Sequence, residues 1–246
     1  MTDLVPWRLN SDGAMLRAGS LECRVDPTHL SSGIQNTLYQ GNRLDSHRLL
    51  SLKIPGLEEA LTGPTVAESY TRGHDFIVTY QAVAPLQFHP QIYWQYRQKS
   101  AACGIETMIS MQTDVLESRP VVEVTAIHPG EMWGYDGSRD AFEPLADDAF
   151  GSYSADEITP VFLTRENGRS FSLLEMAYPT DAHQLLLESV GKEEIALTFR
   201  LMHENLERGV IRRLRVATWF LPREDDLQIA AELFRDLLHA KPPLTT

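Results

Sequence analysis

A strict alternation of side-chain character between Phe88 and Arg97 limits the structures that this chain can adopt. One set of alternate positions is apolar or aromatic: Phe88, Pro90, Ile92, Trp94 and Tyr96. The positions between them carry groups that form hydrogen bonds: His89, Gln91, Tyr93, Gln95 and Arg97. Because successive side chains of a β-strand point to opposite faces, the segment predicts a strand with one wall in the core and one polar wall.

The same period of two recurs elsewhere and predicts a mainly β protein. Residues 105–115 and 195–201 alternate in this way, and turns rich in Gly, Pro and Asn separate many short segments of this kind. Only residues 224–239 carry apolar side chains at the helical spacings of three and four. No linker or repeat divides the chain. We therefore expect one domain over residues 1–246, a large antiparallel β-sandwich with one C-terminal helix at about 224–239.

The segment from residue 131 to residue 157 departs from this pattern. It contains eight carboxylates, with Gly, Ser and Pro residues scattered through it. Such a composition is typical of an acidic excursion over the surface with little regular structure. Long loops of this kind often act as lids over a binding site, and others are plain insertions. The residues themselves do not distinguish these two roles.

The charge of the chain argues against two classes of partner. The net charge is −12, which repels phosphate backbones and anionic membrane surfaces, so neither nucleic acid nor membrane is expected as a partner. The densest positive group is Arg208, Arg212, Arg213 and Arg215. An anion clamp is one interpretation, and pairing with the chain's own carboxylates is the one that we favour. No signal peptide or long apolar run is present, so we expect a cytoplasmic protein. The sequence does not determine the oligomeric state.

Metal and cofactor sites lack their usual motifs. Cys23 and Cys103 are far apart, and the eight His residues include no HxH and no HExxH. Asp136, Ser138 and Asp140 have the spacing of a calcium loop, but Ala141 occupies the position that needs Gly. The glycine-rich motifs that bind nucleotides are absent as well. We expect no metal and no cofactor.

The polar wall supplies the candidate ligand-binding residues. Gln91, Tyr93, Gln95 and Arg97 offer the planar amides, ring and guanidinium fork with which proteins bind sugars, and Arg72 is a further candidate. A pocket needs only a few convergent polar groups of this kind. The alternative is an ordinary sheet face in contact with solvent.

Candidate acids and bases occur near both ends of that wall. The candidate proton donors are His74 and His89, and the candidate base is Glu106. Two other carboxylates are further candidate bases: Glu68 and Asp75. Acid–base catalysis requires these groups within reach of one substrate. The alternative for the segment around His74 is a solvated strand end in which Arg72 pairs with Glu68.

The length, the many strands and the polar faces rich in His, Arg and Glu resemble the galactose mutarotase-like supersandwich. The resemblance implies a concave sheet on which a His acid and a Glu base open a sugar ring. The family's histidine motif, which ends in Tyr-Phe-Asn, is absent, so we assign no residue by this resemblance and use it for architecture alone.

Two functions follow from these patterns. The first is a carbohydrate-binding or sugar-converting protein that uses the polar wall; as an enzyme it would be a sugar epimerase, isomerase or lyase with His/Glu chemistry. The second is a non-catalytic protein-interaction or assembly module that uses the same aromatic-rich face, because Tyr, Trp and Arg also dominate protein interfaces.

Overall fold

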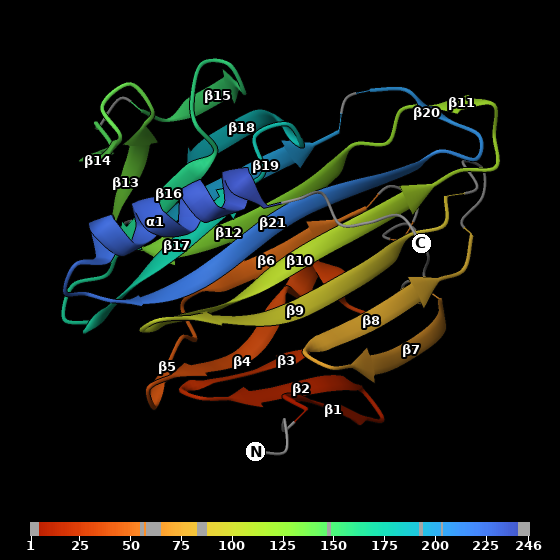
Figure 1. The fold of residues 1–246 in the computed structure, drawn as a ribbon, viewed down its shortest axis with the longest axis horizontal. Helices are drawn as coiled ribbons and strands as arrows, with labels where there is room; N and C mark the ends of the chain where they lie inside the picture. Colours follow the sequence, from red (N-terminus) through yellow and green to blue (C-terminus); the bar gives the residue numbers. More distant parts are fainter. Residues whose placement is uncertain are drawn as a thin grey trace.

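The computed structural model describes residues 5–54, 57, 65–82, 88–146, 149–191, 194–202 and 204–240. Over these residues the protein is a sandwich of two large antiparallel sheets with one α-helix, which confirms the predicted fold class (Figure 1). The helix, α1, spans Asp226–His239, within two residues of the predicted start. It is not long and apolar enough to cross a bilayer, and it is the longest helix in the described part of the chain.

Sheet I has ten strands within the described residues, and most of them come from the first third of the chain or from the second half. In spatial order they are β1 (Trp7–Asn10), β2 (Gly13–Ala18), β3 (Leu21–Val25), β4 (Ile34–Tyr39), β6 (Arg48–Lys53), β12 (Val122–Pro129), β19 (Glu194–Leu201), β18 (Ala182–Ser189) and β15 (Gly151–Ser154). The tenth, β5 (Asn42–Arg43), pairs with β4 off this path. A short 3-10 helix, Leu30–Ser32, joins β3 to β4.

Sheet II has nine strands within the described residues and carries the predicted polar wall. In spatial order they are β14 (Ala141–Pro144), β13 (Glu131–Asp136), β16 (Val161–Arg165), β17 (Phe171–Ala177), β21 (Ile211–Pro222), β10 (Ala102–Gln112), β9 (Gln91–Lys99), β8 (Asp75–Tyr80) and β7 (Val66–Arg72). Outside both sheets, β11 (Glu117–Ser118) and β20 (Leu206–Glu207) form a small ribbon.

The alternation of β9 works as the sequence predicts. Ile92, Trp94 and Tyr96 are buried in the main hydrophobic core between the two sheets. The residues between them are half-buried and lie on the opposite face of sheet II. Burial of apolar side chains on one face, at about 25 cal/mol per Å², fixes which face of this strand turns inward.

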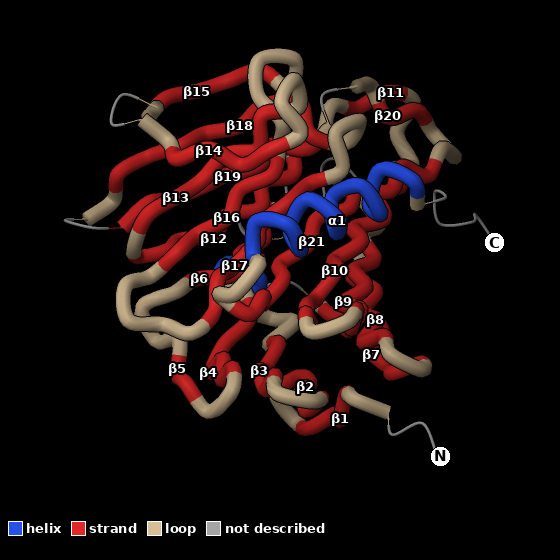
Figure 2. Tube along the Cα trace, turned by 60° about the vertical axis from the view of Figure 1, so that its left-hand side comes forward, coloured by secondary structure: helices blue, strands red, loops and turns tan. Residues whose placement is uncertain are grey.

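A second, smaller core lies on the other side of sheet II. Helix α1 packs Ala230, Leu233 and Phe234 against outward-facing residues of this sheet, including Leu174 and Trp219. Figure 2 shows α1 lying across the strands of sheet II. As a result β17 is buried on both faces along its whole length.

The segment 131–157 is more regular than we predicted. Outside residues 147 and 148, which are not among the described ones, it contains β13 and β14 at one edge of sheet II and β15 at one edge of sheet I. The Tyr135 ring packs against Phe234 of α1, with ring centroids 5.1 Å apart. It also packs against Phe142, with ring centroids 5.2 Å apart. The expectation of an irregular excursion is therefore wrong, because two aromatic side chains give this acidic segment an apolar face to bury.

Candidate functional site

A polar network occupies the outer face of sheet II, the face turned away from sheet I. Gln95 and Glu106 are directly opposite one another on β9 and β10. Arg97 joins them: its Nε donates to Glu106 over 2.8 Å, and its Nη2 donates to the Gln95 side-chain oxygen over 2.9 Å. The three side chains are half-buried. The pairing of β9 with β10 thus brings Glu106 next to Gln95 and Arg97, and the hydrogen bonds of Arg97 hold the three side chains together.

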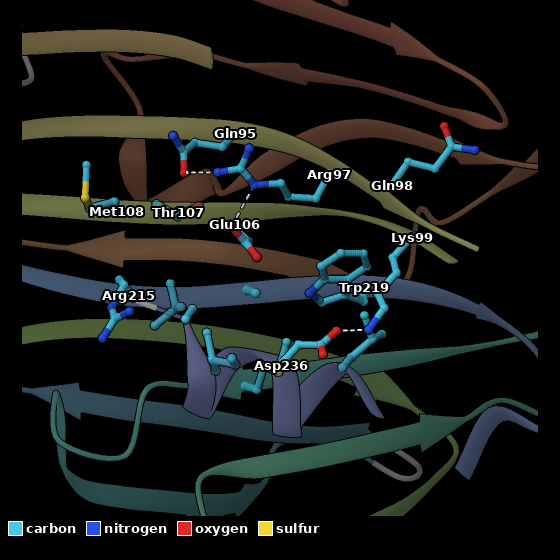
Figure 3. A pocket seen from close by; sticks show the side chains of 16 residues that line it. Gln95, Arg97, Gln98, Lys99, Glu106, Thr107, Met108, Arg215, Trp219 and Asp236 are labelled. Carbon is cyan, nitrogen blue, oxygen red and sulfur yellow. Dashed lines mark hydrogen bonds and ion pairs between the residues drawn. The ribbon is translucent and has the colours of Figure 1, made fainter. Parts of the chain in front are cut away.

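A cavity of about 410 Å³ lies beside this cluster, between sheet II and α1. Gln95, Arg97 and Glu106 line it from the sheet, and α1 contributes Leu233 and Asp236. Figure 3 shows the three polar residues on one side of the cavity and the helix with Asp236 on the other. Its volume lies within the range of about 300–1,000 Å³ that is typical of small-molecule sites.

Trp219 lies between these two sides of the cavity (Figure 3). It is 4% exposed and sits opposite Gly104 in the pairing of β21 with β10. A Cβ atom at position 104 would lie 2.4 Å from the Thr218 carbonyl oxygen and 2.9 Å from Cδ2 of Trp219. Glycine at 104 therefore leaves the space that the indole occupies.

The cavity is bridged at one end by an ion pair between Lys99, the last residue of β9, and Asp236 of α1 (Figure 3). This pair and the Arg97–Glu106 pair neutralise two of the three cations among the described lining residues. The cavity therefore presents little net charge from these groups.

The third cation, Arg215, is held by an aromatic ring and a carboxylate. Its guanidinium lies 3.5 Å from the centre of the Tyr178 ring, and its Nε is 3.6 Å from Asp181 Oδ2. The backbone N–H of Arg215 also donates to Asp181, over 3.0 Å. Burial raises the pKa of Asp181, although Arg215 and Arg212 oppose that shift. The Arg212 Nη2 atom lies 3.6 Å from Asp181 Oδ1. Arg212 and Arg215 thus pair with the chain's own carboxylates, the interpretation that we favoured from the sequence.

The remaining residues of the polar wall continue away from the cavity. Gln91 donates to the Thr79 hydroxyl over 2.9 Å, and the Tyr93 hydroxyl donates to Gln91. Burial raises the pKa of Tyr93, with a further contribution from Tyr70. Gln91 and Tyr93 are not among the residues that line the cavity.

Arg72 lies at the β7–β8 turn, and its guanidinium is 4.0 Å from the Asp75 carboxylate, directly opposite in register. Glu68, four pairs further along β7, faces Thr79. These three charged residues are on the outer strands of sheet II and do not line the cavity.

The two candidate histidines lie apart from the cavity and from each other. The ring of His74 stacks against Tyr96, whose side chain belongs to the core between the sheets, with centroids 6.3 Å apart. His89 lies two residues before the start of β9. It is about 26 Å along the chain from Arg97, at about 3.3 Å per residue. Its Nε2 lies 2.6 Å from Asp114, and both side chains are partly exposed. Of the candidates, the structure brings Gln95, Arg97 and Glu106 together.

A second polar cluster is enclosed between the sheets. Glu175 of β17 accepts a hydrogen bond of 2.6 Å from the Thr218 hydroxyl, and its other oxygen lies 3.2 Å from His128 Nε2. The His128 ring meets that of His47 edge to face at 5.7 Å. Burial, together with the charges of His128 and Arg169, lowers the pKa of His47 to about 3. His128 is fully buried, so a ligand does not reach this cluster from solvent.

Sequence reasoning did not single out the apolar lining of the cavity. Met176, Trp219, Leu233 and Leu237 line it. A signal was present, because Trp219 and Arg215 share a face by alternation and the leucines follow a helical period. What the sequence lacked was the location of the helix over that particular face.

Comparison with known proteins establishes the fold. No protein-family model matches the sequence, and no curated protein matches it. Among solved structures, a galactose mutarotase-like protein from Lactobacillus casei superimposes with a TM-score of 0.53 at 9% identity, over 84% of this chain and 99% of that one. The Slr1438 protein from Synechocystis gives a TM-score of 0.57 at 10% identity, over 89% and 98%.

A larger enzyme contains a similar domain. The α-N-acetylgalactosaminidase NagBb from Bifidobacterium bifidum, solved with GalNAc, matches with a TM-score of 0.60 at 12% identity over 92% of this chain and 38% of its own. The two-sheet architecture is thus that of galactose mutarotase-like β-sandwiches. At these identities the likeness concerns the fold, and activity must be argued from the residues.

Proposed function

We propose that this protein binds a carbohydrate in the cavity between sheet II and α1. The observation that carries the proposal is the Gln95–Arg97–Glu106 cluster, which presents an amide, a guanidinium and a carboxylate to one cavity beside the indole of Trp219. Vicinal hydroxyl groups need donors and acceptors side by side, and an aromatic ring suits the apolar face of a pyranose. The solved structures of the same fold include a sugar-bound enzyme, and this supports the choice of a carbohydrate as ligand.

The proposal concerns the binding of a sugar and does not include its chemical conversion. Mutarotase-like chemistry needs a His acid and a Glu base within reach of one ring. Glu106 faces the cavity, whereas His74 and His89 are not among the described residues that line it. An enzymatic role would therefore require a different proton donor.

The interaction-module alternative is less well supported by this geometry. The largest aromatic side chain of the β9 segment that this alternative would use as an interface is Trp94. It is 2% exposed and belongs to the core between the sheets. Tyr93 is half-buried and hydrogen-bonded to Gln91. An aromatic interface would need these rings at the surface.

Thermal-shift and calorimetric titration with neutral monosaccharides and disaccharides tests the proposal. A ligand at 100 times its Kd stabilises the folded state by about 2.7 kcal/mol, or about 5–11 °C in Tm for a chain of this size. Arg97→Met should weaken binding ten- to a hundredfold, since hydrogen bonds to charged groups contribute about 1.5–3 kcal/mol.

The matched control is Arg17→Met. Arg17 forms a similar cross-strand pair with Glu22 on sheet I, 3.1 Å apart and well exposed. This variant should bind sugar like the wild type. Carbohydrate binding is excluded if neither a sugar of the panel nor an alkyl glycoside gives a shift or heat, or if Arg97→Met binds every sugar as tightly as Arg17→Met.

A further inference from the structure

The cavity has two chemically different walls. On β9 and β10 it is polar, through Gln95, Arg97 and Glu106. On β17, β21 and α1 the lining is mainly apolar, through Met176, Ala217, Trp219, Leu233 and Leu237. The charged residues of these elements that line the cavity, Arg215 and Asp236, are ion-paired with Asp181 and Lys99. Figure 3 shows Trp219 at the boundary, between Glu106 and the helix.

The apolar wall offers Trp219 to the apolar face of a pyranose, but the rest of the wall does not suit the hydroxyl groups of a free sugar. Met176, Trp219 and Leu233 are 1%, 4% and 3% exposed, so this side of the cavity is closely packed and largely withdrawn from water. The Trp219 Nε1–H has no hydrogen-bond partner within the described residues and can donate to one hydroxyl group. Any further hydroxyl group placed there without a hydrogen-bond partner costs about 1–3 kcal/mol. A free monosaccharide has hydroxyl groups around its whole ring, and some of them would face this wall.

The charges of the cavity argue against an anionic sugar as well. Arg97 is paired with Glu106, Lys99 with Asp236 and Arg215 with Asp181. A phosphate or carboxylate of the ligand would have to displace one of these carboxylates, and the displaced group would lose its partner. The lining therefore favours a ligand without net charge.

We propose, on the basis of the proposed carbohydrate site, that the ligand is a neutral glycoside with an apolar aglycone. The sugar ring lies against Gln95, Arg97 and Glu106. The aglycone lies between Trp219 and Leu237 of α1, where its burial contributes to affinity. Helix α1 is firmly placed to form this wall, because Arg165 holds Asp226 at its first turn through two hydrogen bonds of 2.6 and 3.0 Å.

A homologous series of glycosides tests this inference. Methyl, butyl and hexyl glycosides of glucose, galactose and mannose are titrated by calorimetry below the concentration at which they form micelles. Each methylene group withdrawn from water should tighten binding about fourfold, until the apolar part of the cavity is full. The same series should show a plateau once the chain extends past α1 into solvent.

Two adjacent leucines provide a matched pair of variants. Leu237 lines the cavity, whereas Leu238 is 42% exposed on the same helix and is not among the lining residues. Leu237→Gln should remove most of the gain from methyl to hexyl and leave the Kd of the methyl glycoside within about twofold. Leu238→Gln should leave both unchanged. Leu237→Ala, which keeps helix propensity, replaces Leu237→Gln if that variant does not fold.

The outcomes separate this inference from the proposed function. Equal affinity for methyl and hexyl glycosides overturns the inference and leaves the carbohydrate site intact. Binding of hexanol as tightly as hexyl glycoside overturns it too, because the sugar would then contribute nothing. Tighter binding of a sugar phosphate or uronic acid than of the neutral glycosides refutes the choice of an uncharged ligand. A lack of binding by every glycoside and every free sugar refutes the proposed function itself.

Discussion

Replacing Asp226 by Ala removes the carboxylate that fixes the start of α1 to sheet II. Its side chain is 2% exposed and accepts hydrogen bonds from Arg165 Nε and Nη2, at 3.0 and 2.6 Å, and from the Ser172 hydroxyl. Arg165, whose guanidinium also lies 4.5 Å from the centre of the Trp133 ring, would keep its charge without a partner.

The expected cost follows from that burial. Removal of one partner from a buried ion pair costs about 3–5 kcal/mol. Because the Arg165 side chain is 19% exposed and can regain some water, we expect the lower end, about 3 kcal/mol. In a chain of this size that loss lowers Tm by about 6–12 °C. Urea denaturation followed by circular dichroism measures the change in the free energy of unfolding.

The neighbouring aspartate is the control. Asp225 is exposed, has φ of 60° and makes no side-chain cap to the helix. Asn tolerates this left-handed conformation, so Asp225→Asn should change the free energy of unfolding by less than about 0.5 kcal/mol. A loss below about 1 kcal/mol for Asp226→Ala, or an equal loss for both variants, would refute the claim that this buried pair anchors the helix.

Two further predictions concern the strand contact beneath the cavity and the enclosed histidines. Gly104→Ala should cost about 1–3 kcal/mol and alter tryptophan fluorescence, because its Cβ would lie 2.4 Å from the Thr218 carbonyl oxygen; Gly137→Ala, with its nearest atom 3.5 Å away, should be nearly neutral in the same urea titration. The pKa of His47, which burial lowers to about 3, implies that the unfolded state binds the proton more readily below about pH 6.5. The free energy of unfolding should therefore fall as pH decreases from 6.5 towards 3, by up to about 1.4 kcal/mol per pH unit; urea titrations from pH 4 to 7 should show a shallower fall for His47→Gln than for the wild type.

The local parts of the fold were predictable from the sequence. The alternation in β9 placed Ile92 and Trp94 in the core, since the pattern that marks one strand face as apolar is contained in neighbouring residues. The helical period gave α1 to within two residues of its observed start at Asp226. The carboxylates of residues 131–157 concealed β13 and β14, because Tyr135 finds its packing partner Phe234 on an element much later in the chain.

The site was predictable only in part. The strand alternation identified Gln95 and Arg97, which line the cavity. It did not place His74, because Gly73 and His74 form the turn between β7 and β8 and end the alternation there. The apolar wall depends on which face of sheet II the helix covers, and that is decided by long-range packing that no local pattern contains.

The enclosed Glu175 has a consequence for the way β17 finds its place in sheet II. A strand that is apolar on both faces can slide by one residue and still bury its side chains, so hydrophobicity alone specifies its alignment weakly. In β17 such a slip would turn Glu175 away from Thr218 and His128 and towards the apolar helix side, without a hydrogen-bond donor. The carboxylate therefore penalises misaligned sheets. Together with Ser172, whose hydroxyl donates to Asp226 on the helix side, it marks the alignment of a strand that is otherwise apolar on both faces.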